Sequence, residues 1–119
     1  MSYTPSHHCL DYVEIAATDL EANKAFFTAL FGWTFTDYGP DYVAFEDGRL
    51  AGGFHRVAAA DLSVKGPTLI VFFSEDLAAT QASVEEAGGS ISVPVFEFPG
   101  GRRFHFLGPD HIEYAVWAY

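Results

Sequence analysis

The sequence predicts an α+β fold made of two copies of one unit, in which a strand and a helix precede three further strands. Three observations support this prediction: the pattern of residues 10–33, its recurrence in the second half of the chain, and a composition that is 50% hydrophobic and 18% charged. Internal repetition is informative because it fixes the architecture of the whole chain. With 119 residues the chain can form a sizeable core, and we expect one domain over residues 1–119.

The first unit opens on a strand and a helix. Apolar and polar residues alternate over residues 12–16, which is the period of a half-buried strand. Thr18 and Glu21 have the spacing of a capping box at the start of a helix, and Asp19 is an alternative N-cap. The helix that follows carries an apolar stripe. Gly32 stands where a left-handed C-cap is expected to end it.

Three strands are expected after this helix. Residues 34–37 read as a short strand, and residues 41–46 alternate in polarity. The dipeptide Asp47-Gly48 is a strong hairpin signal, so residues 49–57 return as the partner strand.

The second half of the chain repeats this order of elements. The Asp-Leu pair at 76–77 repeats the pair at 19–20. Module one therefore covers about residues 9–57, and module two covers about residues 67–119. Pro94 indicates an edge strand or a bulge in the second module. The expected strand, helix and three strands of module two occupy residues 69–73, 76–87, 90–96, 102–107 and 112–119.

Composition excludes several classes of partner. A formal net charge of −10 disfavours nucleic acid and anionic membrane surfaces, and is compatible with a cationic ligand. A single cysteine excludes an intrachain disulfide, and the chain has no apolar leader or membrane-spanning run, so we expect a cytoplasmic protein. The 12 Phe, six Tyr and two Trp exceed what most cores of this size contain, and some of them are candidates for lining a ligand pocket.

Four segments carry a resemblance to a known family: residues 17–20 (ATDL), 25–33 (AFFTALFGW), 106–110 (FLGPD) and 113–117 (EYAVW). Together with the internal repeat, they resemble the vicinal oxygen chelate superfamily of glyoxalase I, bleomycin-resistance proteins and extradiol dioxygenases. The resemblance implies that each copy is a βαβββ module. It also implies that the two modules curl their sheets into an incomplete barrel around a ligand cavity.

Metal-dependent members of this superfamily bind a divalent ion at four strand positions. Counted on this sequence, those positions fall on Tyr12, Gly52, Leu69 and Ala115, or on Glu113 in place of Ala115 if the last turn is shortened. Leucine, glycine and alanine side chains offer no donor atom, and a lone phenol is a poor ligand for a divalent ion. We therefore expect neither a bound metal nor another cofactor.

Because side chains alternate between the two faces of a strand, the residues two positions away from these four are expected to share their face and to complete the wall of the cavity. Glu14 and Glu113 share that wall as candidates for acid/base catalysis or residual metal binding, and the simpler interpretation is that they are solvated or paired carboxylates. His55 is expected to lie one residue off the cavity face, and His105 to point away from the face that Phe104 and Phe106 occupy. The expected ligand-binding residues are Tyr12, Leu50, Gly52, Phe54, Leu69, Val71, Ala115 and Trp117.

Two functions fit these residues. The first is a metal-free binding protein of the bleomycin-resistance type, which takes a small aromatic or cationic molecule rather than an anion. The second is a lyase or isomerase-like enzyme that uses Glu14 or Glu113, with or without a metal. A homodimer is expected because two half-sheets leave strand edges exposed. Whether the modules pair within one chain or are swapped between chains stays open.

Overall fold

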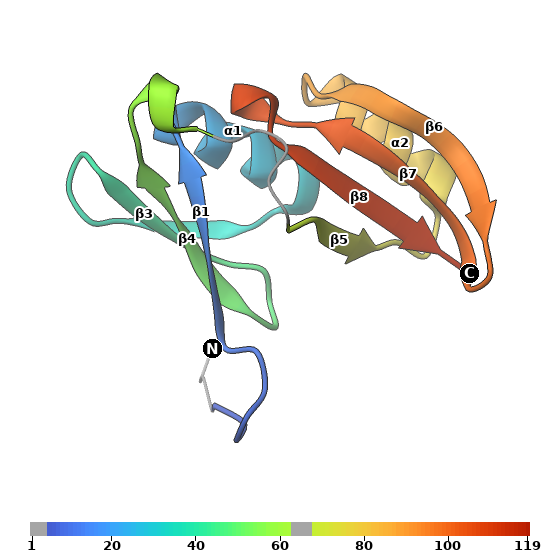
Figure 1. The fold of residues 1–119 in the computed structure, drawn as a ribbon, viewed down its shortest axis with the longest axis horizontal. Helices are drawn as coiled ribbons and strands as arrows, with labels where there is room; N and C mark the ends of the chain where they lie inside the picture. Colours follow the sequence, from blue (N-terminus) through green and yellow to red (C-terminus); the bar gives the residue numbers. More distant parts are fainter. Residues whose placement is uncertain (1–4, 63–67) are drawn as a thin grey trace. The chain divides into compact units, whose positions relative to one another are not determined.

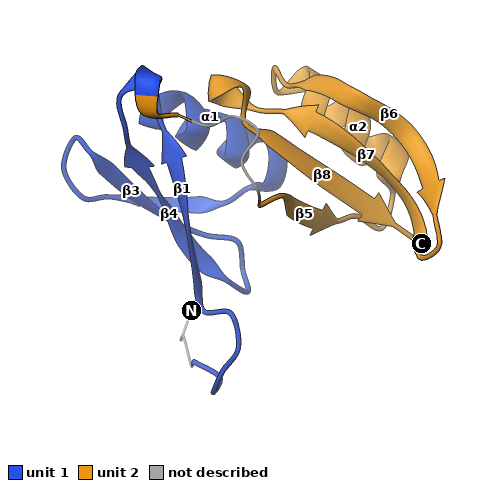
Figure 2. Cartoon of the chain, in the orientation of Figure 1, with its two compact units in different colours: residues 1–60 blue, residues 61–119 orange. Residues whose placement is uncertain are grey.

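The computed structural model describes residues 5–62 and 68–119 of the chain. The chain divides into two compact units, residues 1–60 and residues 61–119, which contain the two predicted modules (Figure 2). No helix in the described part of the chain is both long enough and apolar enough to cross a membrane.

Module one contains one helix and one mixed sheet (Figure 1). Its elements are β1 (Tyr12–Ala17), α1 (Leu20–Phe31), β2 (Thr34–Asp37), β3 (Tyr42–Glu46) and β4 (Ala51–Arg56), followed by the short 3₁₀ turn η1 (Ala59–Asp61). The four strands lie in the order β1-β4-β3-β2. β1 is parallel to β4, whereas the pairs β3–β4 and β2–β3 are antiparallel.

Module two repeats this topology. Its elements are β5 (Ile70–Phe73), α2 (Leu77–Glu86), β6 (Ser90–Phe98), β7 (Gly101–Leu107), the 3₁₀ turn η2 (Pro109–His111) and β8 (Glu113–Ala118). The sheet order is β5-β8-β7-β6, with β5 parallel to β8 and the remaining pairs antiparallel. The predicted α+β class and the two βαβββ modules are confirmed. The incomplete barrel concerns the placement of the modules and stays a prediction.

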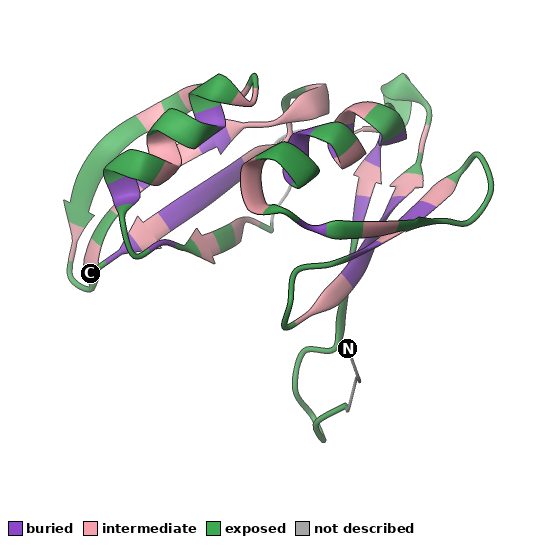
Figure 3. Cartoon of the chain, turned by 180° about the vertical axis from the view of Figure 1, so that it is seen from behind, coloured by how far each residue is buried: buried purple, intermediate pink, exposed green. Residues whose placement is uncertain are grey.

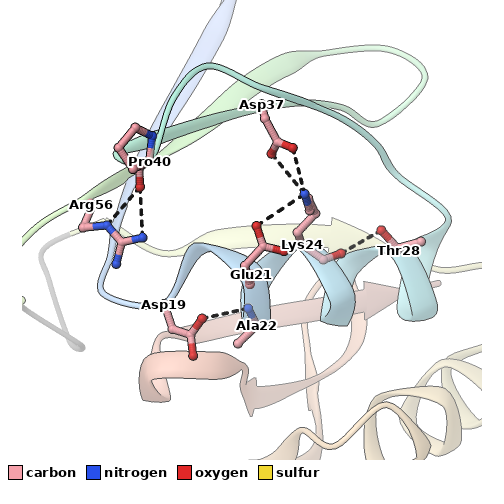
Figure 4. Close-up of polar contacts among 8 residues, drawn as sticks. All are labelled: Asp19, Glu21, Ala22, Lys24, Thr28, Asp37, Pro40 and Arg56. Atoms are coloured by element: carbon pink, nitrogen blue, oxygen red, sulfur yellow. Dashed lines mark hydrogen bonds and ion pairs between the residues drawn. The ribbon is translucent and has the colours of Figure 1, made fainter.

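The two helices begin in the same way. Asp19 has extended backbone angles, and its carboxylate accepts a hydrogen bond from the Ala22 N–H at 2.9 Å (Figure 4). Asp76 accepts one from the Ala79 N–H at 3.1 Å. The N-cap of α1 is therefore the alternative, Asp19, rather than the Thr of the capping box. The predicted left-handed C-cap is confirmed at Gly32, where φ is 69°.

The core of module one lies between α1 and one face of its sheet. The ring of Trp33 stacks between Phe27 and Phe45, with centroid distances of 4.4 Å to each. Phe27 and Phe54 are fully buried, and their rings stack at 5.9 Å. The outer sides of the helices remain exposed (Figure 3). The face of the sheet away from α1 is free to carry other chemistry, and we call it the open face of module one.

Module two has an equivalent core against α2. Phe104, Phe106 and Val116 are fully buried, and Tyr114 is 1% exposed. Pairing of β6 with β7 shifts register between Ile91 and Val93 and again between Val93 and Phe96, a stretch that contains Pro94, and β6 is an edge strand. Both predictions from Pro94 are therefore confirmed. The face of this sheet away from α2 is the open face of module two.

Candidate functional site

The open face of module two carries the residues that alternate with its core. Val71 on β5 pairs with Ala115 on β8, and Phe73 pairs with Trp117. Arg103 on β7 in turn pairs with Trp117. This pairing places Val71, Ala115 and Trp117 on one side of the sheet, and their role in binding stays a prediction. Leu69 lies just before β5 and is half-buried.

This open face contains a pocket with a volume of about 380 Å³. Its wall is largely aromatic. The ring centroid of Trp117 lies 5.0 Å from that of Tyr119 and 6.3 Å from that of Phe98, both in edge-on geometry. The lining residues are Val71, Phe98, Gly100, Arg103, Trp117 and Tyr119.

Arg103 is the charged group of this pocket. The central carbon of its guanidinium lies 5.4 Å from the ring centroid of Phe96 and 5.9 Å from that of Phe98, so the cation lies against two π faces. Its Nε is buried and has no hydrogen-bond partner among the described residues. Within the same part of the chain, no carboxylate lies at ion-pair distance from Arg103.

Glu113 lies on the same open face and is paired. The Ser92 hydroxyl donates a hydrogen bond to its Oε2 at 3.0 Å, and Nδ1 of His105 lies 3.5 Å from the same oxygen. The side chains of His105 and Glu113 are only 12% and 14% exposed. His105 points away from the face of Phe104 and Phe106, as predicted, and this brings it beside Glu113.

The predicted alternation of β4 is wrong by one residue. Phe54 was expected on the cavity face, but it is fully buried and its ring lies 5.5 Å from Phe45 in the core. Gly52 shares that side, since a Cβ there would lie 2.4 Å from the Phe45 ring. Leu50 precedes β4 and closes the hairpin by accepting a hydrogen bond from the Asp47 N–H at 3.1 Å. Burial of the large Phe54 ring sets the phase of the strand.

The open face of module one is therefore built differently from the prediction. Tyr12 and Glu14 are both exposed and lie next to Ala51 and Gly53 of β4. His55, which was expected off this face, lies on it, and its Nδ1 is buried without a hydrogen-bond partner among the described residues. A second hollow, with a volume of about 430 Å³, is lined in part by Tyr12, Tyr38, Glu46 and Ala51.

Tyr42 lies across this face because Gly53 has no side chain. A Cβ at Gly53 would lie 2.1 Å from the Tyr42 hydroxyl oxygen, so the phenol occupies the space that a side chain would need. The Tyr42 hydroxyl contacts that of Tyr12. Burial raises the pKa of Tyr42 above its ordinary value, and hydrogen bonds with Tyr12 and Glu14 raise it further.

In the part of each module that the structure describes, the side chains form no donor set that fits a divalent metal. Among residues 5–62 and 68–119, no three His, Cys, Asp or Glu side chains gather closely enough to hold one. Gly52, at one of the positions implied for the metal, lies on the helix side of its sheet. In module two, Glu113 and His105 supply two donors, whereas a zinc site takes three or four protein ligands.

The two mixed sheets, each with a helix on one face and a hollow on the other, define a class of small paired-module α+β proteins. The chain belongs to the Glyoxalase/Bleomycin resistance protein/Dioxygenase superfamily, whose sequence profile matches residues 9–116. This match confirms the resemblance drawn from the sequence.

Two curated relatives are the anthracycline biosynthesis proteins DauV of Streptomyces sp. (strain C5) and DnrV of Streptomyces peucetius. Each is 30% identical to the chain over 124 aligned residues, and the match covers 89% of the chain and 45% of the relative. The chain thus spans less than half the length of these relatives.

Solved structures show the same fold at lower identity. The fosfomycin resistance protein FosX of Listeria monocytogenes superposes with a TM-score of 0.80 at 17% identity, over 96% of this chain and 95% of that one. A glyoxalase/bleomycin resistance protein/dioxygenase family enzyme of Burkholderia phytofirmans PsJN gives a TM-score of 0.78 at 17% identity, over 91% and 96%. At this identity the likeness shows the fold alone.

Sequence reasoning missed Arg103 and Tyr42. The face on which Arg103 lies could have been predicted once the register of the preceding hairpin was known, because Arg103 alternates with the apolar Phe104. Tyr42 has no such signal, since its position depends on the missing side chain of Gly53 on a neighbouring strand.

Proposed function

We propose that this protein binds a small aromatic molecule in the pocket on the open face of module two. The observation that carries the proposal is the wall formed by Trp117, Phe98 and Tyr119 around a volume of about 380 Å³. Pockets for small ligands have volumes of roughly 300–1,000 Å³ and are mostly apolar with a few polar groups. Membership of a superfamily with bleomycin resistance proteins, and relatives named for anthracycline biosynthesis, support a ligand of this kind.

We also propose that binding at this pocket needs no metal. The aromatic wall supplies stacking and edge-on contacts that are independent of a metal. Glu113 and His105 form a pair of donors, which supports binding without a metal rather than chelation of the ligand through one.

A second candidate function is supported by the open face of module one. Tyr12, Tyr42 and Glu14 form a connected group of two phenols and a carboxylate, and Glu46 adds another negative charge to the hollow. Such a face suits a cationic ligand, or proton transfer by Glu14 in a lyase or isomerase-like reaction. Glu113, beside Ser92 and His105, is the corresponding acid/base candidate in module two.

The first proposal is tested by the fluorescence of Trp117. The sequence contains two tryptophans, and Trp33 is buried in module one, so Trp33→Phe leaves Trp117 as the reporter of the pocket. We expect saturable quenching when a naphthalene derivative or an anthracycline is added, and the same affinity after treatment with a chelator. Trp117→Ala should weaken binding, measured by calorimetry, by roughly tenfold or more. The reason is that stacking of an aromatic ring the size of a nucleobase on an aromatic side chain contributes about 1–3 kcal/mol.

The control is Trp33→Phe itself, which should bind as tightly as the wild type by calorimetry because Trp33 lies in the core of module one. Loss of binding on chelation would contradict the metal-free mode. Unchanged affinity in Trp117→Ala would contradict the assignment of the pocket.

A further inference from the structure

We propose that the module-two pocket is selective for flat aromatic acids, in which the rings of the pocket hold the aromatic part and the Arg103 guanidinium receives the carboxylate or acidic oxygen. This inference rests on the proposed function and specifies the ligand class of the same pocket. It assigns Arg103 as the residue that determines specificity.

Arg103 has no acidic partner in the described part of the chain. Lys24 and Arg56 each lie within ion-pair distance of an aspartate, at 3.0 Å from Asp37 and 3.4 Å from Asp41. Arg103 makes no such pair, although the chain contains 16 acidic residues and only six Lys and Arg. A guanidinium left without a carboxylate in so acidic a chain is available to an acidic ligand.

The Arg103 guanidinium lies against aromatic rings and keeps an unused hydrogen-bond donor among the described residues. Contacts with the rings of Phe96 and Phe98 restrict its motion, and its buried Nε makes no hydrogen bond to the described residues. A buried donor without a partner costs free energy, which an acceptor on a ligand returns. The planar fork of Arg matches a carboxylate with two parallel hydrogen bonds, so the site favours that geometry.

The charges that line the pocket also favour an anionic ligand. None of the residues that line the pocket is acidic, and Arg103 is the charged one. The net charge of −10 acts over distances at which salt screens it, with a Debye length of about 8 Å at physiological ionic strength. An apolar wall lowers the local dielectric and strengthens a direct contact between Arg103 and an anion. The preference for cations expected from the sequence is thus replaced by the opposite preference for this pocket.

The test is calorimetric titration with three ligands of matched shape: 2-naphthoate as the anion, 2-naphthamide as the neutral analogue and 2-naphthylmethylammonium as the cation. We expect the wild type to bind the anion most tightly. Arg103→Gln should weaken naphthoate binding by roughly 10- to 100-fold, as expected for charge-assisted hydrogen bonds, and change naphthamide binding by about twofold or less. Arg103→Lys should lie between, because it keeps the charge and loses the fork.

Arg49→Gln is the matched control. It removes the same charge from an exposed side chain in the turn before β4, in module one. We expect naphthoate affinity to be unchanged in this variant. If both glutamine variants lost the same naphthoate affinity, the loss would be an effect of net charge, and the assignment of Arg103 would be overturned.

The ligand series separates the two levels of the proposal. Tight binding of naphthamide without a preference for naphthoate would overturn the inference and leave the proposed function standing. Absence of binding by all three ligands to the wild type would overturn both. If Arg103→Gln does not fold, the wild-type order of affinities and the Arg103→Lys variant decide the question.

Discussion

At the scale of single residues, Tyr42 and Tyr114 have environments that hold their phenolic protons. Tyr114 is 1% exposed in the core of module two, and burial raises its pKa, with a smaller contribution from the charge of Asp110. Burial also raises the pKa of Tyr42, with hydrogen bonds to Tyr12 and Glu14 adding to it. Both groups therefore favour the neutral phenol in the folded state.

We predict that Tyr42 and Tyr114 ionise at higher pH in the folded protein than in the unfolded chain. An absorbance titration of the phenolates should show a late fraction, and Tyr42→Phe and Tyr114→Phe should each remove part of it. The control is the chain in denaturant, where the phenols share an ordinary pKa of about 10. If the folded and unfolded titrations coincide, the environments assigned to these tyrosines are wrong.

The raised pKa values of Tyr42 and Tyr114 also determine the direction in which stability changes with pH. Because the folded-state pKa values are raised, the stabilisation is fully present below the unfolded pKa and is lost as pH rises through the folded values. The free energy of unfolding should therefore fall as the pH rises above about 10, and fall less steeply in the Tyr42→Phe/Tyr114→Phe double variant.

Two single residues also explain why the cavity-facing side of β4 was predicted wrongly from the sequence. Gly52 and Gly53 stand side by side in the middle of the strand and have no side chain to mark either face. Alternation could then be counted in either phase, and only the contacts of Phe54 with Phe27 and Phe45 decide between them. Such contacts join strands and a helix that are far apart in the sequence, so no local pattern contains them.

At the scale of elements, the two glycines of β4 face different neighbours. A Cβ at Gly52 would lie 2.3 Å from the Val13 carbonyl oxygen and 2.4 Å from the Phe45 ring. The three atoms nearest to a Cβ at Gly53 all belong to the Tyr42 phenol, the closest at 2.1 Å. Backbone of a paired strand cannot move aside, whereas a phenol on the open face can turn toward solvent.

We predict that Gly52→Ala destabilises the protein by about 3 kcal/mol or more, and Gly53→Ala by about 1 kcal/mol or less, from the cost of overpacking. Urea unfolding of both variants measures the difference, with each glycine serving as the matched control for the other. Gly53→Ala should also reduce the late fraction of the tyrosine titration, since it displaces Tyr42. Equal losses of stability would contradict the assigned faces of β4.

Elements with short-range signals were predictable from the sequence. The Asp N-caps of α1 and α2, the turn at Asp47-Gly48 and the bulged edge strand at Pro94 each depend on residues that are close in the chain. The open faces depend instead on cross-strand neighbours. Arg103 gains its environment from Phe96, its cross-strand partner on β6, and from Phe98, and that pairing is set by the register shift between Val93 and Phe96.

At the scale of the whole molecule, the two modules share a core plan and differ in their open faces. Each has an aspartate at the start of its helix and buried aromatic rings beneath it. Module one presents phenols and carboxylates on its open face, whereas module two presents aromatic rings and Arg103. Repetition has thus preserved what each module needs in order to fold, while the two hollows suit ligands of different charge.

The exposed apolar side chains of module two bear on the assembly of the chain. Phe73 and Phe96, which are not among the residues that line the pocket, are 49% and 37% exposed. β5 and β6 are the edge strands of this sheet, and β1 and β2 are those of module one. Apolar surface and strand edges of this kind favour association, which removes both from water. We therefore propose a homodimer.

The prediction is that light scattering at micromolar concentration gives twice the chain mass of 13.0 kDa. The melting temperature should rise with protein concentration, because association stabilises the folded state by mass action. Phe73→Asp should shift the mass toward the monomer if its half-exposed ring is covered in the dimer, since burying an unpaired carboxylate is costly. Leu10→Asp, at an 85% exposed position before β1, is the control for added charge and should leave the mass unchanged. A mass of 13.0 kDa for the wild type, independent of concentration, would contradict the homodimer.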